Sequence, residues 1–249
     1  MSKEIASMVL AGGMGTRLGL KDKPKPLAIV GDRPILDWTL ETLEQLPVQQ
    51  TVIVVGHMGE KIIQRYSSRA NVEFARQGIL MGNASAVLFG IGKLSSTVKD
   101  ILVIQGDDSA FLTKGTLLNL MEKHKEEENF ATLLLTRDLN RNLHKHFYTT
   151  DSRGRIIGRM MVSGESFLNR QGCYFNTGTL CLNVKFAKAQ IPHLVPRKNY
   201  EIEIPDLVNL ALEKELNVGF VEAREGEWLS INTLEGLRIA SERIAREKS

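Results

Sequence analysis

The sequence has few cysteines and no long hydrophobic run. Its two cysteines, Cys173 and Cys181, lie eight residues apart in an apolar stretch, which suits neither a disulfide framework nor a zinc site. We expect buried free thiols in a reducing compartment. No stretch of about 18 apolar residues occurs, so no segment is predicted to span a membrane. The first residues lack the basic-then-apolar pattern of a signal peptide, and together these absences predict a cytoplasmic protein.

A large excess of one charge is also missing, because 32 basic and 29 acidic residues give a formal net charge of +3. So small an excess gives no reason to expect a nucleic acid partner, which usually requires a basic patch. The basic residues that do cluster, Arg17, Lys21, Lys23 and Lys25, suit a small polyanion better. With 249 residues and an apolar content of 43%, the chain can form a full globular core.

Short apolar, β-branched runs alternate with helical patterns through the first half of the chain. Such runs are typical of strands buried on both faces of a mostly parallel sheet. Repeated β-α-β units require right-handed crossovers, and they predict an α/β fold, a three-layer sandwich around a mixed, mostly parallel sheet. The expected strands are residues 5–10, 51–55, 72–75, 101–104 and 130–136, and the expected helices are 35–46, 60–67, 84–94 and 116–128.

From about residue 139 the pattern changes. Residues 147–150 and 155–162 flank a turn sequence at 151–154 and are predicted to form a hairpin. Further strands are expected at 174–182 and 217–221, Pro205 suits a first helical turn, and a helix runs from 233 to the end. No linker or repeat separates the halves, so we expect a single domain, 1–249, with lobes at about 1–138 and about 139–249.

The first predicted strand ends in a glycine-rich loop, Leu10-Ala11-Gly12-Gly13-Met14-Gly15-Thr16-Arg17. Its three glycines allow the backbone to turn and to bring several N–H groups to one point, a nest that binds phosphate. Arg17 adds a charge-assisted donor for the same oxygens. Downstream, the prolines of Lys23-Pro24-Lys25-Pro26 restrict the backbone, which favours a rigidly held Lys25 facing a phosphate.

Two common phosphate-binding motifs do not fit this loop. A P-loop requires a glycine, four further residues and then Gly-Lys-Ser or Gly-Lys-Thr, and the sequence lacks this pattern here. A dinucleotide fingerprint that starts at Gly13 requires a glycine at position 18, where Leu18 stands and Gly19 comes one residue late. The near miss leaves an NAD(P)-dependent oxidoreductase open as an alternative, and a solvated basic turn is another.

The loop, followed by Leu18 and by Lys23-Pro24-Lys25-Pro26-Leu27, resembles the signature of the nucleotide-sugar pyrophosphorylases, or sugar-phosphate nucleotidyltransferases. Within that family the chain is most similar to the uridylyltransferase domain of bacterial N-acetylglucosamine-1-phosphate uridylyltransferase. The resemblance extends with gaps from about residue 4 to 240 and is most specific in the first 40 residues. It implies the Rossmann-like fold of the nucleotide-diphospho-sugar transferases, catalytic roles for Arg17 and Lys25, and nucleotide binding by Leu10, Ala11, Gly12, Gly13, Gly15 and Thr16.

The resemblance assigns magnesium to Asp107 and Asn232, and relatives often have an apolar residue where this chain has Asp108. Asp107 follows a predicted strand, where its carboxylate would face the same crevice as the glycine loop. Magnesium commonly uses one or two protein ligands and completes its shell with phosphates and water. Structural roles remain alternatives, because Asp107 and Asp108 suit a surface turn and Asn232 with Glu235 has capping-box spacing.

In the family, Gln77, Gly82 and Asn83 fall in the nucleotide-binding region. Relatives usually have Gly-Thr-Gly or a similar small loop where this chain has Gly82-Asn83-Ala84, so the chain matches at Gly82 and departs at Asn83. An amide at Gln77 can pair with uracil or thymine, and a solvated loop glutamine is the alternative. On the acceptor side, Asn176 and Gly178 match an Asn-Thr-Gly motif whose asparagine contacts the sugar, with a strand kink at Gly178 as the alternative. Two departures, Lys145-His146-Phe147-Tyr148 for Gly-Tyr-Gly-Arg and Met161 for a glutamate, are expected in the sugar pocket.

These features predict a magnesium-dependent nucleotidyltransferase that joins a nucleoside triphosphate, with UTP or dTTP favoured, to a sugar 1-phosphate or similar phosphomonoester and releases pyrophosphate. The first lobe would bind the nucleotide and the second the acceptor. A phosphate with a second pKa near about 6 is mostly dianionic at pH 7, so the acceptor requires no general base. The alternatives are cytidylyl transfer to phosphocholine or another non-sugar phosphate, the oxidoreductase, and a non-catalytic nucleotide-binding regulator. No oligomeric state is predicted.

Overall fold

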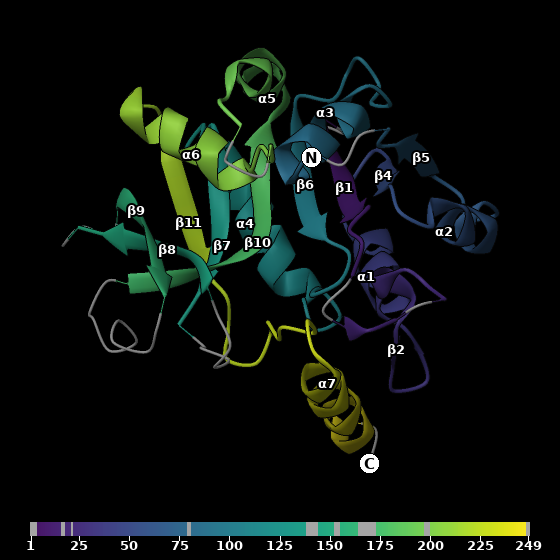
Figure 1. Cartoon of the computed structure of the whole chain (residues 1–249). Helices are drawn as coiled ribbons and strands as arrows, with labels where there is room; N and C mark the ends of the chain where they lie inside the picture. Colours follow the sequence, from purple (N-terminus) through teal and green to yellow (C-terminus); the bar gives the residue numbers. More distant parts are fainter. Residues whose placement is uncertain are drawn as a thin grey trace.

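The computed structural model describes residues 4–15, 18–20, 22–78, 81–137, 144–151, 155–163, 173–196 and 200–247. Within these ranges one sheet has the strand order β11-β7-β10-β6-β1-β4-β5, and the β8–β9 hairpin extends it from β10 (Figure 1). The strands are β1 (Ile5–Ala11), β4 (Thr51–Val55), β5 (Val72–Arg76), β6 (Asp100–Gln105), β7 (Ala131–Thr136), β8 (His144–Thr150), β9 (Ile156–Ser163), β10 (Cys173–Asn183) and β11 (Val218–Glu222).

All strands along this order except β10 run in the same direction. β1 pairs in parallel with β4 and β6, β4 with β5, and β11 with β7. β10 runs the other way between β6 and β7 and so joins the two halves of the chain in one sheet. The predicted mixed, mostly parallel sheet is confirmed, and the predicted strands match the observed ones closely, except that β8 begins three residues earlier.

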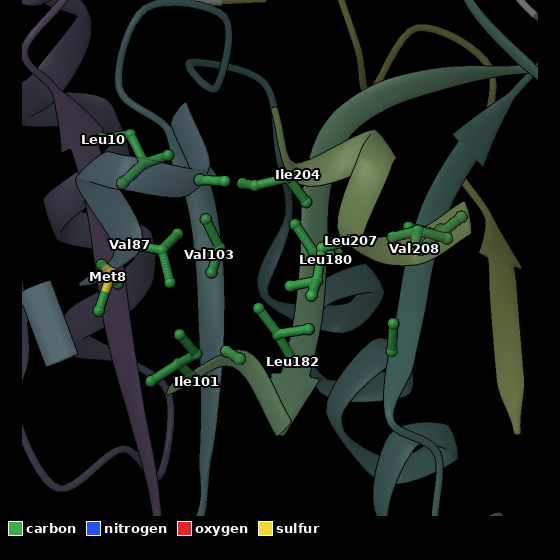
Figure 2. Packing of buried hydrophobic residues seen from close by; sticks show 14 of the residues in the cluster. Met8, Leu10, Val87, Ile101, Val103, Leu180, Leu182, Ile204, Leu207 and Val208 are labelled. Carbon is green, nitrogen blue, oxygen red and sulfur yellow. The ribbon is translucent and has the colours of Figure 1, made fainter. Parts of the chain in front are cut away.

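Helices cover both faces of the sheet. Met8 and Leu10 of β1 belong to an apolar cluster with α3 (Asn83–Ile91), α5 (Val184–Gln190) and α6 (Ile204–Glu213). Figure 2 shows Val103 of β6 on this face, with Val87 of α3 and Leu207 of α6. Alternate strand residues such as Val9 point to the opposite cluster, with α1 (Ile35–Glu44), α2 (Gly59–Tyr66) and α4 (Lys114–Glu126). The predicted three-layer sandwich is therefore confirmed.

The last helix, α7 (Leu234–Glu247), projects away from the sheet (Figure 1). Its Ala240 and Ile244 pack in a third apolar cluster with Val30 of the short hairpin β2 (Ile29–Val30) and β3 (Arg33–Pro34). Phe111 and Ile231 belong to the same cluster, so the segment that leads into α7 is held beside the loop that follows β6. This packing places the segment before α7 beside the loop at the carboxyl end of β6.

Several short elements were not predicted. They are the β2–β3 hairpin, the 3-10 turns η2 (Lys25–Leu27) and η4 (Ile191–His193), and α5. For α5 the signal was present, because the Asn183 side chain accepts the backbone N–H of Phe186 as an N-cap directly after the strand. Both cysteines are free thiols, as predicted, but only Cys181 is buried, and burial raises its pKa, whereas Cys173 is half-buried. No helix in the described part of the chain is long and apolar enough to cross a membrane.

Candidate active site

Two adjoining pockets open where β1 and β6 end. The first, of about 250 Å³, lies at the glycine-rich loop, and the second, of about 300 Å³, lies between β6, β10 and the start of α6. Asn83, Gln105 and Asp107 line both pockets, so the two share a wall. A crevice at the carboxyl ends of parallel strands is where α/β sheets bind their ligands.

Every predicted site residue that the structure describes lines one of these pockets. The first is lined by Leu10, Ala11, Gly12, Gly13, Gly15, Lys25, Gln77, Gly82, Asn83 and Asp107, and also by Met14, Pro26, Ala86, Gln105 and Glu201. The second is lined by Asn176, Gly178, Asn232, Asn83 and Asp107, and also by Gln105, Asp108, Leu133, Thr177, Leu180, Glu203, Ile204 and Pro205. Thr16 and Arg17 lie outside the described residues.

Lys25 lies at the junction of the two pockets. It begins the turn η2 directly after Pro24, and its side chain is only 5% exposed. The Nζ atom donates to Asp107 Oδ2 at 2.8 Å, to Asn232 Oδ1 at 2.8 Å and to Asp108 Oδ1 at 3.2 Å. An ammonium group has three donors, and each here has an oxygen partner, so the side chain is held in one direction. Asp107 does lie in a turn, as the surface-turn alternative requires, but its carboxylate faces the Lys25 ammonium.

Asn232 does not cap the last helix. Thr233 does so instead, because its Oγ1 accepts the backbone N–H of Gly236 at 3.0 Å. The Nδ2 atom of Asn232 donates to Asp108 Oδ2 at 3.1 Å and to Ser230 Oγ at 2.7 Å, while its Oδ1 faces Lys25. The capping-box alternative for Asn232 is therefore wrong, since α7 begins one residue later than that spacing requires.

Gln77 is buried and fixed. Its Nε2 donates to the carbonyl of Gly82 at 3.1 Å, and a Cβ on Gly12 would lie 3.1 Å from its Oε1. The alternative of a solvated loop glutamine is therefore wrong. Asn83 lines both pockets and also makes a structural hydrogen bond. Its Oδ1 accepts the backbone N–H of Ile204 at 2.7 Å. This bond satisfies one of the free donors at the start of α6.

The segment of residues 200–203 is attached to the loop before α3. Ile202 donates its N–H to Met81 O at 2.8 Å and accepts from Ala84 N at 3.1 Å. Gly82 lies at this contact with φ +88°, and a Cβ there would be 2.4 Å from the carbonyl oxygen of Ile202. The absence of a side chain at Gly82 thus allows this segment to approach and to bring Glu201 and Glu203 to the pockets.

Replacing Gly82 with alanine should therefore lower the free energy of unfolding by about 1–3 kcal/mol, because the new Cβ meets backbone and the φ angle is strained. Denaturant unfolding measures this loss. Gly13→Ala is the matched control, since a Cβ at Gly13 meets no atom within 4 Å, and it should change the stability by less than about 0.5 kcal/mol. Equal stabilities of the two variants would contradict this description of the contact.

The acceptor-side residues Asn176 and Gly178 lie at an irregularity of β10 and also line the second pocket. The Oδ1 of Asn176 accepts the N–H of Gly178 at 3.0 Å, and the pairing of β10 with β7 shifts its register between Asn176 and Leu180. The strand is thus kinked, and both residues still line the second pocket. The expectation that the departures at Phe147 and Tyr148 lie in the pocket is wrong, because both side chains are buried in apolar clusters. The side chains of Lys145, His146 and Met161 lie outside the described part of the structure.

Sequence reasoning missed several polar residues of the site. Asp108, Gln105, Glu201 and Glu203 line the pockets, and Ser230 contacts Asn232. Gln105 and Asp108 flank Gly106-Asp107, so their position beside the predicted ligand was an available signal. Among the described residues that line the two pockets, Lys25 is the only cation, against four carboxylates. This part of the site therefore favours cations.

Comparison with known proteins gives the class to which this fold belongs, the nucleotidyltransferases. Residues 7–162, more than half of the chain, match the model of the MobA-like NTP transferase domain. The chain therefore belongs to the family of MobA-like NTP transferase domains, and the nucleotidyltransferase class predicted from the glycine-rich loop is confirmed. This family assignment decides against the oxidoreductase alternative.

Two curated GlmU proteins are similar in sequence to most of this chain. Bifunctional protein GlmU of Trichlorobacter lovleyi is 27% identical over 98% of this chain and 52% of its own length. GlmU of Pelobacter propionicus is 28% identical over 85% of this chain and 46% of its own length. The chain thus spans about half the length of these curated relatives.

Solved structures support the fold. A Bacillus anthracis protein described as a glucose-1-phosphate thymidylyltransferase, in complex with sucrose, superimposes with a TM-score of 0.80 at 23% identity and covers 97% of this chain and 95% of its own. A UDP-glucose pyrophosphorylase complexed with UDP-glucose gives a TM-score of 0.77 at 16% identity, with 97% and 98% covered. Because the sequence identities are below 25%, these superpositions bear on the fold alone. They confirm the predicted Rossmann-like nucleotide-diphospho-sugar transferase fold.

Proposed function

We propose that this protein transfers a nucleotidyl group, in a magnesium-dependent reaction, from a nucleoside triphosphate to a sugar 1-phosphate or a similar phosphomonoester. UTP and dTTP are the favoured donors, because a UDP-glucose pyrophosphorylase and a thymidylyltransferase are among the proteins it resembles. The observation that supports this most is the junction of two pockets at Asp107 and Lys25, which allows two phosphorylated substrates to meet at one charged point.

The two pockets suggest the roles of the two lobes. We assign the nucleotide to the first pocket, whose lining comes from residues 10–107 except for Glu201. The backbone of Gly12, Gly13 and Gly15 would donate to its phosphates, and Gln77 would lie beside the base. We assign the acceptor to the second pocket, to which β10 and the start of α6 contribute Asn176 and Gly178. Residues 1–138 would thus form a nucleotide-binding lobe and 139–249 an acceptor-binding lobe.

The oxygen atoms at the junction fit magnesium. Asp107 and Asn232 offer a carboxylate and an amide oxygen, the hard ligands that magnesium prefers, and both lie 2.8 Å from one cationic group, Lys25 Nζ. No group of three or more His, Cys, Asp or Glu side chains suited to a metal occurs among the described residues, so the proposed site relies on two protein ligands plus substrate phosphates. When bound there, the ion would neutralise phosphate charge.

The proposed reaction is an in-line displacement at phosphorus. A non-bridging oxygen of the acceptor phosphate forms a bond to the α-phosphorus, the bond from that phosphorus to the bridging oxygen of the β-phosphate breaks, and pyrophosphate leaves with the electron pair. Lys25 would hold the α-phosphate and the acceptor phosphate, and Arg17 the leaving phosphates. Because the acceptor oxygen is already anionic, alignment and charge compensation carry the rate.

Pyrophosphate release across a set of substrate pairs tests this proposal. UTP, dTTP, CTP, ATP and GTP are each combined with glucose 1-phosphate, N-acetylglucosamine 1-phosphate and phosphocholine, with magnesium or with EDTA. We expect release that requires magnesium and one sugar 1-phosphate, with UTP or dTTP as the better donor. Release only with CTP and phosphocholine would select the cytidylyltransferase alternative. No release with any pair would favour a non-catalytic nucleotide-binding protein.

A further inference from the structure

Asp108 has contacts that the proposed reaction does not use. It follows Asp107 at the end of β6 and is 11% exposed. Its Oδ1 accepts the backbone N–H of Ile231 at 2.8 Å, and its Oδ2 accepts Nδ2 of Asn232 at 3.1 Å. These bonds join the loop after β6 to the segment before α7, 123 and 124 positions away in sequence.

The chemistry of the neighbours fixes which way the Asn232 amide faces. A carboxylate only accepts hydrogen bonds, so the NH2 group must face Asp108, and Ser230 Oγ takes its second hydrogen at 2.7 Å. An ammonium only donates, so the amide oxygen must face Lys25, at 2.8 Å. The orientation therefore follows from partners with one possible role each and not from the similar shapes of the two amide ends.

We propose that Asp108 is a positioning residue that directs the amide oxygen of Asn232 toward the place where Lys25 and Asp107 meet, and so prepares Asn232 to bind a divalent cation. The inference rests on the proposed function, which assigns the cation to Asp107 and Asn232. Residues behind a metal ligand commonly orient it, and their loss lowers metal affinity by about 10–100-fold. Asp108 also holds the backbone of this segment through Ile231, so it fixes both the position and the orientation of the ligand.

Asp108→Asn is the sharpest change, because it keeps the shape and alters one oxygen to NH2. The new side chain has a single acceptor oxygen for three donors, the N–H of Ile231, the NH2 of Asn232 and the ammonium of Lys25. If the amide oxygen of the variant side chain at 108 stays with Ile231, the NH2 group of the same side chain meets the NH2 group of Asn232. The Asn232 amide must then turn, and its oxygen no longer faces Lys25. If it stays with Asn232, the backbone contact is lost. Either arrangement displaces the Asn232 Oδ1 atom from its place beside Lys25.

A second substitution should restore the arrangement. In the double variant D108N/N232D, the oxygen of the residue at 108 accepts from Ile231, and its NH2 donates to the new carboxylate. The second carboxylate oxygen then faces Lys25, and the Ser230 hydroxyl donates instead of accepting. Donors and acceptors match again at every contact, and the net charge equals that of the original chain. Asp108→Glu serves as the charge control, since it keeps the charge and lengthens the side chain by one methylene.

Manganese binding to the full chain, titrated with Mn²⁺ alone and followed by electron paramagnetic resonance, measures the effect without any turnover. We expect Asp108→Asn and Asp108→Glu to weaken Mn²⁺ binding about 10–100-fold, and D108N/N232D to recover most of it. Asp32→Asn, an exposed carboxylate in the β2–β3 turn, makes the same charge change outside both pockets and should leave the affinity unchanged. Thermal unfolding of each variant shows that the protein compared is folded.

The outcomes separate this inference from the proposed function. Unchanged affinity in Asp108→Asn, full affinity in Asp108→Glu, or no recovery in the double variant would each overturn the positioning role. So would an original chain that binds no Mn²⁺. If the original chain binds Mn²⁺ but releases no pyrophosphate with any substrate pair, the proposed reaction fails, while the affinities of the variants still decide the role of Asp108.

Discussion

Asp107→Asn is expected to lower kcat by at least about 10²–10³-fold while the protein stays folded. The Asp107 carboxylate is the one charged side chain in the wall that the two pockets share. Its loss removes a proposed ligand of the magnesium ion that would compensate phosphate charge where the two phosphates meet. Asp107 is 32% exposed and contacts Lys25, which keeps its bonds to Asp108 and Asn232 when Asp107 is replaced. Steady-state pyrophosphate release with the best substrate pair measures the effect.

The matched control is Asp32→Asn, which removes one exposed carboxylate that lines neither pocket and should retain full turnover. Thermal unfolding should give closely similar midpoints for both variants. An Asp107→Asn protein with near-normal kcat at saturating magnesium would remove Asp107 from the proposed machinery, and the surface-turn alternative would then account for it.

Lys25→Met is expected to separate catalysis from metal binding. Turnover should fall by about 10²–10³-fold, because the ammonium that would hold the α-phosphate and the acceptor phosphate is lost. Mn²⁺ binding to the nucleotide-free chain should become tighter by about tenfold or more, because the ammonium no longer occupies the oxygens of Asp107 and Asn232. Removing a catalytic side chain would thus improve metal affinity.

Methionine suits this test because Lys25 is only 5% exposed and an unbranched apolar chain of similar length fills its space. Lys185→Met, on the exposed side of α5, is the control for the loss of one positive charge and should change neither quantity. If Lys25→Met keeps full turnover, or if its Mn²⁺ affinity falls, Lys25 does not compete for the cation position in the manner the geometry indicates.

The features that were predicted correctly are those that a short stretch of sequence determines. The apolar runs that became β1, β4 and β6 carry their burial in their own composition. The glycine-rich loop and the Lys23–Pro26 segment are local motifs, and residues of both line the first pocket, while their roles stay predictions. Each of these depends on a few consecutive residues, so no knowledge of distant contacts was required. The family resemblance then supplied Asp107, Asn232, Asn176 and Gly178.

The features that were missed depend on contacts between distant residues. Asp108 resembled any second aspartate in a turn, and its bonds to Ile231 and Asn232 arise only when α7 packs on the β2–β3 hairpin. Asn232 had the spacing of a capping box, but contact with Lys25, 207 positions away, competes for its oxygen. A local pattern indicates what a side chain is able to do, and tertiary packing decides which of those contacts it makes.

The destination of the acceptor's own phosphate oxygens tests the central claim most directly. The acceptor that gives the most pyrophosphate is prepared with ¹⁸O at the three non-bridging phosphate positions, and the products are analysed by mass spectrometry. Attack by that phosphate on the α-phosphorus predicts a nucleotide-linked product that retains all three labels, together with unlabelled pyrophosphate. A nucleoside monophosphate formed with or without the acceptor, or label in the pyrophosphate, would contradict the account.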